Sequence, residues 1–173
     1  MRPIKEVAGQ VLRWTQPSSF KRDFQLRAGE EVVATLRWQK PAGSLALAES
    51  AGGAWTFKRS GFLTPTVSVR PQGSETAIAV FKAGGRGEGT LQFTDGRRYQ
   101  WLIAGFWRPK WSFASDAGGP LIHFKYDLAF LQQTMEVEIE PGGAPLQDLP
   151  LLATLGWYLI VLLSEGGGGA VSG

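Results

Sequence analysis

The sequence predicts a mainly β protein: a closed antiparallel β-barrel of about twelve strands that encloses one hydrophobic C-terminal α-helix. Apolar and polar residues alternate over most of the chain before residue 140, which is typical of strands with one face in a core. Glycine-containing turns separate the alternating segments. The segment 149–163, LPLLATLGWYLIVLL, is apolar on every side, so as a helix it must be buried.

Twelve short segments are expected as strands. They cover residues 10–15, 23–28, 32–38, 45–49, 55–58, 67–70, 78–80, 91–94, 98–103, 111–115, 122–126 and 135–140. The Asp95-Gly96 pair between two alternating runs is the strongest hairpin signal. The alternation also predicts which side chains face the core, among them Val32, Ala34, Leu36 and Trp38 in one strand and Ile78 and Val80 in another.

The apolar segment is expected to be a core helix over residues 149–164. Asp148 suits an N-cap, Pro150 suits the first turn and Gly166 suits a C-cap. A helix of this length reaches only about 24 Å, whereas a membrane span needs about 20 apolar residues with basic flanks. A tail anchor and a partner-binding helix remain alternatives. Gly156, in the middle of this helix, either permits close approach to a strand or has no role.

The helix sets the expected width of the barrel. Side chains alone fill an eight-stranded barrel, and a helix is about 10–12 Å across, so about twelve strands are needed to enclose one. We therefore expect a single domain over residues 9–165, an N-terminal extension over 1–8 and a flexible glycine-rich tail over 166–173.

The amino-acid composition excludes several kinds of functional site and disfavours one class of protein. The 173 residues include no cysteine, which excludes disulfides, thiolate metal sites and cysteine nucleophiles. The first residues lack the apolar core of a secretory signal, so a cytoplasmic protein is expected. The net charge is +3, and the basic residues are scattered along the chain, which disfavours a dedicated nucleic-acid-binding protein.

No catalytic residue, metal site or cofactor is predicted. His123 is the only histidine, and the alternation places it outward as a surface residue. Glu136, Glu138 and Glu140 form an acidic row that is expected to pair with Arg or Lys across the sheet rather than to bind a cation. The glycine-rich segment 84–89 precedes a strand and is interpreted as a hairpin loop, not a phosphate-binding loop.

Basic pairs and one aromatic loop are the candidate binding features. The pairs Lys21-Arg22, Lys58-Arg59 and Arg97-Arg98 either form a patch for anionic headgroups or are ordinary solubilising charges. The segment 106–111, FWRPKW, suits a membrane interface, base stacking or packing over the barrel rim. The candidate lipid- or anion-binding residues are Lys58, Arg59, Arg97, Arg98, Trp107, Arg108 and Lys110.

Three stretches resemble a known family. They are WTFKRSGFL (55–63), DGRRYQW (95–101) running on to Phe106-Trp107, and the closing helix. On these the chain resembles a bacterial member of the LURP-one-related family, in the superfamily of Tubby-like proteins and phospholipid scramblases. The resemblance implies a twelve-stranded barrel around a C-terminal helix. Tubby-like domains bind phosphoinositide headgroups through surface Lys and Arg and scramblases act at membranes, but no stretch here aligns with the Tubby lipid-binding residues.

The expected function is therefore a non-enzymatic binding or scaffold domain, cytoplasmic and peripheral to the membrane, that contacts an anionic surface or a phosphoinositide-like headgroup. One alternative is a tail-anchored protein that uses residues 149–163. The other is an enzyme with an unrecognised site.

Overall fold

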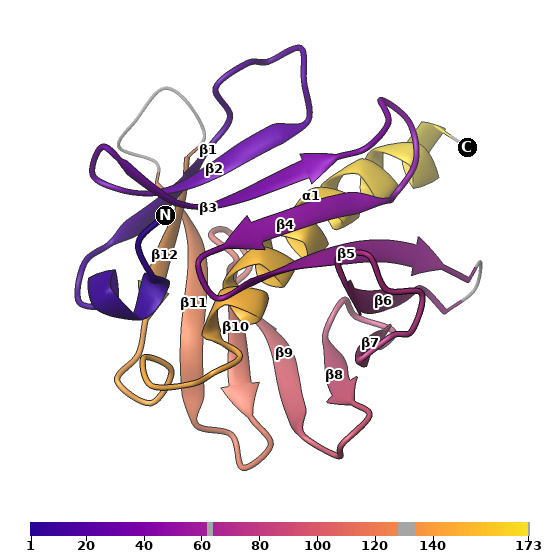
Figure 1. Cartoon of the computed structure of the whole chain (residues 1–173). Helices are drawn as coiled ribbons and strands as arrows, with labels where there is room; N and C mark the ends of the chain where they lie inside the picture. Colours follow the sequence, from indigo (N-terminus) through magenta and orange to yellow (C-terminus); the bar gives the residue numbers. More distant parts are fainter. Residues whose placement is uncertain (62–63, 128–133, 173) are drawn as a thin grey trace.

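The computed structural model describes residues 1–61, 64–127 and 134–172. Twelve antiparallel strands form a closed barrel in which each strand pairs with its neighbours in sequence and β1 closes on β12 (Figure 1). The strands are β1 (Leu12–Thr15), β2 (Asp23–Ala28), β3 (Glu31–Trp38), β4 (Ala46–Ser50), β5 (Gly53–Ser60), β6 (Thr66–Pro71), β7 (Ala79–Ala83), β8 (Gly89–Phe93), β9 (Arg98–Ala104), β10 (Lys110–Ser115), β11 (Pro120–Asp127) and β12 (Thr134–Ile139). The predicted fold class is confirmed.

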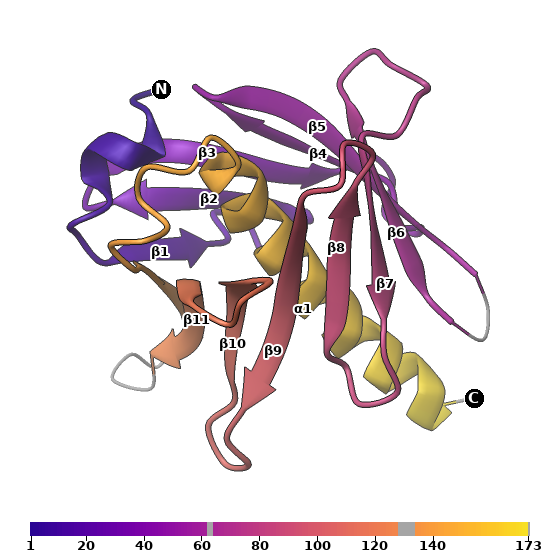
Figure 2. The same cartoon turned by 90° about the horizontal axis from the view of Figure 1, so that it is seen from below.

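One helix, α1 (Leu149–Ser172), passes through the barrel (Figure 2). Every residue from 151 to 160 is buried, and the helix contacts strands on opposite walls. Trp157 stacks on Trp14 of β1 with ring centroids 6.2 Å apart, and Tyr158 stacks on Trp38 of β3 at 5.3 Å. Aromatic pairs of this kind add about 0.5–1.5 kcal/mol beyond the area they bury. The apolar segment is therefore a core helix, as predicted.

The helix begins where the sequence predicted and ends later. Its first residue follows Asp148, but the helix continues through Gly166 to Ser172. A glycine ends a helix by taking a left-handed conformation, whereas Gly166 keeps helical backbone. In the described part of the chain, no helix has both the length and the hydropathy that a membrane crossing requires.

The N-terminal residues also belong to the domain. Ile4–Val7 form a short 3-10 helix, η1, that contacts α1. Ile4 and Val7 are both buried in the hydrophobic core. The segment expected as an extension outside the barrel therefore covers one of its ends.

Two strands differ from the predicted pattern, β3 at Val32 alone and β7 over its whole inward face. In β3, Val33 and Ala34 are both buried and Val32 is only half-buried, because the pairing with β2 shifts by one residue at this point. In β7, Ala79 and Phe81 face the core, and the predicted Ile78 and Val80 are half-buried. The pairing of β7 explains this difference: Ala79 lies opposite Phe93 and Phe81 opposite Leu91, and residues directly opposite each other share a face of the sheet.

Candidate functional site

The connections between antiparallel strands alternate between the two ends of the barrel. Residues 29–30, 51–52, 72–78, 94–97, 116–119 and 140–148 lie at the end where α1 begins, here called the closed end. Pro150 of α1 packs beside Gly52, and Arg97 bonds Asp148, which places these turns around the start of the helix. At the other end, the open end, α1 leaves the barrel (Figure 2). The described residues that connect strands there are 16–22, 39–45, 61, 64–65, 84–88 and 105–109.

Charge is segregated between the two ends. Among the described residues, the open-end connections carry the cations Lys21, Arg22, Lys40, Arg86 and Arg108 and a single acid, Glu88. The closed-end connections carry Glu30, Glu75, Asp95, Asp116, Glu140 and Asp148 and a single cation, Arg97. The adjoining strand ends at the open end carry charged side chains of both signs, namely Asp23, Arg59, Lys82, Lys110 and Asp127. The segregation also matches the dipole of α1, whose positive N-terminus lies at the acidic end.

Large aromatic side chains stand in water at the open end. Phe20 is 97% exposed, Phe106 is 91% exposed and Trp107 is 89% exposed. The prediction that Trp107 packs over the rim is therefore wrong. Among the described residues, the aromatic ring that Trp107 contacts is that of Phe106, with ring centroids 5.8 Å apart. Trp111 does pack on the barrel, against Tyr126 at 5.7 Å. Exposed aromatic rings beside cations are typical of a surface that meets a partner.

The seven predicted candidates do not form one patch. Trp107, Arg108 and Lys110 line a shared depression at the open end. Lys58 and Arg59 lie at the end of β5 that points the same way. Arg97 and Arg98 instead lie at the closed end of the barrel. The alternation of turns along the chain was the signal that could have separated these groups before the structure was known.

The open end also contains features that the candidate list missed. Phe20 is among the most exposed apolar residues, and Lys40 and Arg86 lie in two further open-end connections. A cavity of about 710 Å³ opens here beside α1. The described residues that line it are Trp14, Thr15, Gln16, Pro17, Ser19, Phe24, Tyr126, Thr134, Trp157, Ile160, Val161 and Ser164. Sequence alternation cannot predict such a cavity, because it depends on how the helix sits against the wall.

Three buried polar atoms of the cavity residues lack a hydrogen-bond partner in the described structure. They are the indole nitrogens Nε1 of Trp14 and Trp157 and the hydroxyl Oγ1 of Thr134. Leaving a buried donor unpaired costs about 1–3 kcal/mol. The indole nitrogens of Trp38 and Trp101, which do not line this cavity, also lack a hydrogen-bond partner. The cavity is nevertheless the place where several such atoms gather.

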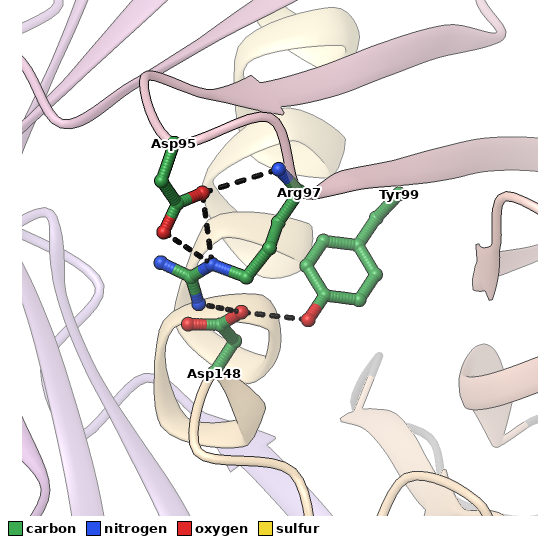
Figure 3. Close-up of polar contacts among 4 residues, drawn as sticks. All are labelled: Asp95, Arg97, Tyr99 and Asp148. Atoms are coloured by element: carbon green, nitrogen blue, oxygen red, sulfur yellow. Dashed lines mark hydrogen bonds and ion pairs between the residues drawn. The ribbon is translucent and has the colours of Figure 1, made fainter.

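At the closed end, a polar cluster of two buried residues, Tyr99 and Asp148, and two exposed residues, Asp95 and Arg97, holds the start of the helix (Figure 3). The carboxylate of Asp148 accepts hydrogen bonds from Arg97 Nη1 and from the hydroxyl of Tyr99, the latter at 2.6 Å. Arg97 also donates to Asp95, at 2.8 Å. The cluster thus joins the turn between β8 and β9 to the residue that precedes α1. The Asp148 side chain bonds Arg97 and Tyr99, and its predicted N-cap bond to the first N–H groups of α1 is not among its contacts in the described structure.

The cluster shifts the ionisation of its members. Burial and the hydrogen bond to Asp148 raise the pKa of Tyr99 above its ordinary value. Burial acts to lower the pKa of Arg97, but its bonds to Asp148 and Asp95 raise the pKa overall. The backbone hydrogen bond from Arg97 lowers the pKa of Asp95. Asp148 faces a neutral phenol and a fixed cation, an arrangement that suits anchoring rather than proton transfer at neutral pH.

His123 is buried, which corrects its expected surface position. Its ring Nδ1 lies 2.6 Å from Ser112 Oγ, and its Nε2 lies 2.8 Å from Glu140 Oε1. The alternation placed the ring on the outer face of β11 correctly, but neighbouring side chains and the chain after β12 cover it. A Ser–His–carboxylate series is the hydrogen-bonding pattern of an activated nucleophile. Here, however, Ser112 and His123 lie within paired strands, where the ladder uses the backbone N–H groups that would stabilise an oxyanion.

Two of the three acidic residues, Glu136 and Glu138, pair with cations across the sheet as predicted, whereas Glu140 contacts His123 instead. Glu138 lies 2.6 Å from Lys125, and Glu136 lies 3.3 Å from Arg13. The hydrogen bond from Lys125 lowers the pKa of Glu138. No cluster of three or more potential metal ligands occurs among the residues that the structure describes. The segment 84–89 connects β7 to β8, so the hairpin interpretation is confirmed.

Comparisons of the chain with protein-family models, with curated proteins and with solved structures found no match.

Proposed function

We propose that the protein binds anionic membrane surfaces through the open end of its barrel, as a non-enzymatic, peripheral binding domain on the cytoplasmic side. The observation that carries the proposal is the position of Phe20, Phe106 and Trp107, exposed at the end whose described connections are almost purely basic. Amphipathic aromatic rings settle at the level of lipid headgroups, and cations beside them meet the negative potential of the cytoplasmic leaflet.

The magnitudes support reversible attachment. Each Lys or Arg close to an anionic surface contributes about 1 kcal/mol, and this contribution falls with added salt. Each large aromatic side chain that leaves water contributes about 1.5–3 kcal/mol, which salt does not remove. Five open-end cations and three exposed aromatic rings are therefore enough for binding that weakens in salt and does not vanish.

Vesicle flotation tests the proposal. Vesicles that contain phosphatidylglycerol should carry the protein to the top of a gradient, and pure phosphatidylcholine vesicles should carry much less. The double variant Phe106→Ser, Trp107→Ser should reduce binding at both low and high salt, because it removes exposed apolar rings without touching the core. Arg108→Glu should reduce binding at low salt above all.

The control lies at the other end of the molecule. Lys5 is exposed in η1, beside the closed end, so Lys5→Glu makes the same change of charge as Arg108→Glu. It should leave flotation unchanged. Equal loss with both variants would mean that net charge, not the open end, governs binding. Failure of the unmodified protein to float with anionic vesicles would overturn the proposal.

A second candidate function is hydrolysis by Ser112, favoured only by its contact with His123 and through it with Glu140. In that reaction Ser112 Oγ would attack an acyl or phosphoryl centre while His123 Nδ1 took its proton, and His123 would return this proton to the departing alcohol or amine. Water would then release the acid and restore the serine. A fluorophosphonate probe should then label the protein, and Ser112→Ala should abolish the labelling. If the probe does not label the native protein, Ser112, His123 and Glu140 have a purely structural role.

We further propose that the chain is a distant member of the LURP-one-related family. The closed twelve-stranded barrel with its C-terminal helix supports this membership.

A further inference from the structure

The barrel wall closes through one of its shortest strand pairings. β1 pairs with β12 over only three residue pairs, Leu12 to Trp14 with Val137 to Met135. Toward the open end, the two strands no longer pair with each other. Thr15 and Gln16 on one side and Thr134 on the other line the cavity of about 710 Å³. The cavity therefore lies where the two strands separate, and α1 forms its inner side through Trp157, Ile160 and Val161.

The lining of this cavity changes from apolar to polar along its length. Trp14, Phe24 and Trp157 are buried at its inner part. Gln16 and Ser19, from the connection between β1 and β2, and Ser164 of α1 lie toward the open end. No charged side chain is among the described lining residues. A lining of this kind fits a molecule with an apolar chain and an uncharged polar region, within the range of about 300–1,000 Å³ typical of small-molecule sites.

The unpaired polar atoms narrow the chemistry of the occupant. The indole N–H groups of Trp14 and Trp157 can only donate, and the Thr134 hydroxyl can donate as well. Neutral donors without a cation nearby suit an ester carbonyl better than a carboxylate or a phosphate, because a buried anion needs a charged partner. These nitrogens are buried, so the rings must shift slightly as the cavity fills.

We infer that this cavity receives an acyl chain of a membrane phospholipid, with the ester group held near Trp14, Trp157 and Thr134. The headgroup then remains at the open end, where Lys21 stands in the adjoining connection. The inference deepens the proposed function, since the surface that meets the membrane is also the entrance to the cavity. It adds that the protein takes up one lipid molecule, which surface attachment alone does not require.

The experiment measures lipid that stays with the protein after the membrane is removed. The full chain is incubated with phosphatidylglycerol vesicles, separated from them by size exclusion and examined by native mass spectrometry. One phospholipid per chain is the expected result. Incubation with lipid dispersed in a mild detergent provides a second route that does not depend on vesicle binding.

Two substitutions on α1 form a matched pair. Val161 lines the cavity and is only partly buried, so Val161→Trp should fill the space without disturbing the core. Leu163 is two residues away, is 44% exposed and does not line this cavity, so Leu163→Trp adds the same side chain elsewhere. Val161→Trp should abolish lipid retention yet still float with anionic vesicles, whereas Leu163→Trp should retain lipid like the native protein.

A third variant tests the donors. Trp14→Phe keeps an aromatic ring and removes the indole N–H, and it should weaken retention roughly twofold to tenfold in competition with native protein. Glycerophosphoglycerol, the headgroup without acyl chains, should not compete for the cavity.

The outcomes separate the two proposals. Native protein that floats but retains no lipid by either route overturns the cavity inference and leaves membrane binding intact. Retention from detergent without flotation supports the cavity and overturns the membrane-binding proposal. Retention by Val161→Trp equal to that of native protein, or competition by the bare headgroup, places the lipid elsewhere and overturns the inference. A circular dichroism spectrum like that of native protein checks that each variant is folded.

Discussion

Gly156 of α1 lies directly against the aromatic ring of Phe124 on β11. A Cβ atom added at Gly156 would stand 2.9 Å from one ring carbon of Phe124 and closer still to two others. The helix is therefore seated against the wall at a place where only glycine fits. Of the two interpretations of this residue that the sequence allowed, close approach to a strand is the correct one.

Gly156→Ala should destabilise the protein even though alanine favours helix. The substitution gains about 1 kcal/mol of helix propensity, but overpacking of a closely packed core costs typically about 1–3 kcal/mol or more. We expect a net loss of about 1–2 kcal/mol, measured by urea unfolding. Gly85→Ala, at a position with open space around it, should change stability little. A more stable Gly156→Ala variant would show that the helix can move away from Phe124.

The same contact predicts coupling between the two positions. Phe124→Leu creates space beside the helix, so Gly156→Ala should cost less in that background than in the native protein. Residues in contact typically show interaction energies of about 0.5–3 kcal/mol in a double-mutant cycle. Strict additivity of the two changes would contradict the close packing.

Asp148→Asn should loosen the start of α1. The substitution keeps the shape of the side chain but removes the negative charge of the carboxylate, which accepts hydrogen bonds from Arg97 and from the Tyr99 hydroxyl. Because hydrogen bonds to a charged group are worth about 1.5–3 kcal/mol and Arg97 can turn to solvent, we expect a loss of about 1–3 kcal/mol in the free energy of unfolding.

The control for this prediction is an exposed ion pair at the same end of the barrel. Asp116 lies 3.2 Å from Arg98, with both side chains about half exposed. Asp116→Asn should therefore cost no more than about 1 kcal/mol. Equal effects of the two substitutions would mean that burial of Asp148 adds nothing.

Stability should fall as the pH rises above 10. Burial raises the pKa of Tyr158 to about 12 from its ordinary value of 10.0, and its hydroxyl donates to the backbone oxygen of Ser44 at 2.7 Å. Between these two values the unfolded chain releases the phenolic proton and the folded chain keeps it, so the folded state loses stability with rising pH. The contribution is complete below pH 10 and is lost as pH approaches 12.

Tyr158→Phe removes this titration. Urea unfolding at pH 8, 10 and 11 should show a shallower alkaline decline than in the native protein, by up to about 1.4 kcal/mol per pH unit. At neutral pH the variant should be less stable by about 1 kcal/mol, because the Ser44 oxygen loses its donor. Parallel declines in the two proteins would assign the alkaline effect to other groups, of which Tyr99 is the first to test.

Ile4→Ala should destabilise the whole barrel rather than fray its N-terminus. Ile4 is 1% exposed and packs in the core beside α1, and truncation of such a side chain costs about 2–5 kcal/mol. The exposed neighbour Lys5 provides the control, and Lys5→Ala should be close to neutral. Thermal unfolding monitored by circular dichroism checks both variants.

Sequence patterning predicted most of the fold and little of the candidate site. The strand positions, the hairpin at Asp95-Gly96 and the start of the buried helix all follow from local periodicity and capping. The inward face of β7 was misassigned, because apolar residues occupy both faces of that strand and only its pairing with β8 decides between them. The burial of His123 likewise depends on Ser112 and Glu140, which lie on other segments of the chain.

By itself the sequence determined the architecture, since an all-round apolar helix and twelve half-apolar strands can satisfy each other only by enclosure. Tertiary structure alone decided the exposure of Phe20 and Trp107, the burial of His123 and the cavity beside α1. The physical reason is that periodicity is local, whereas exposure, burial and cavities depend on packing between residues far apart in sequence.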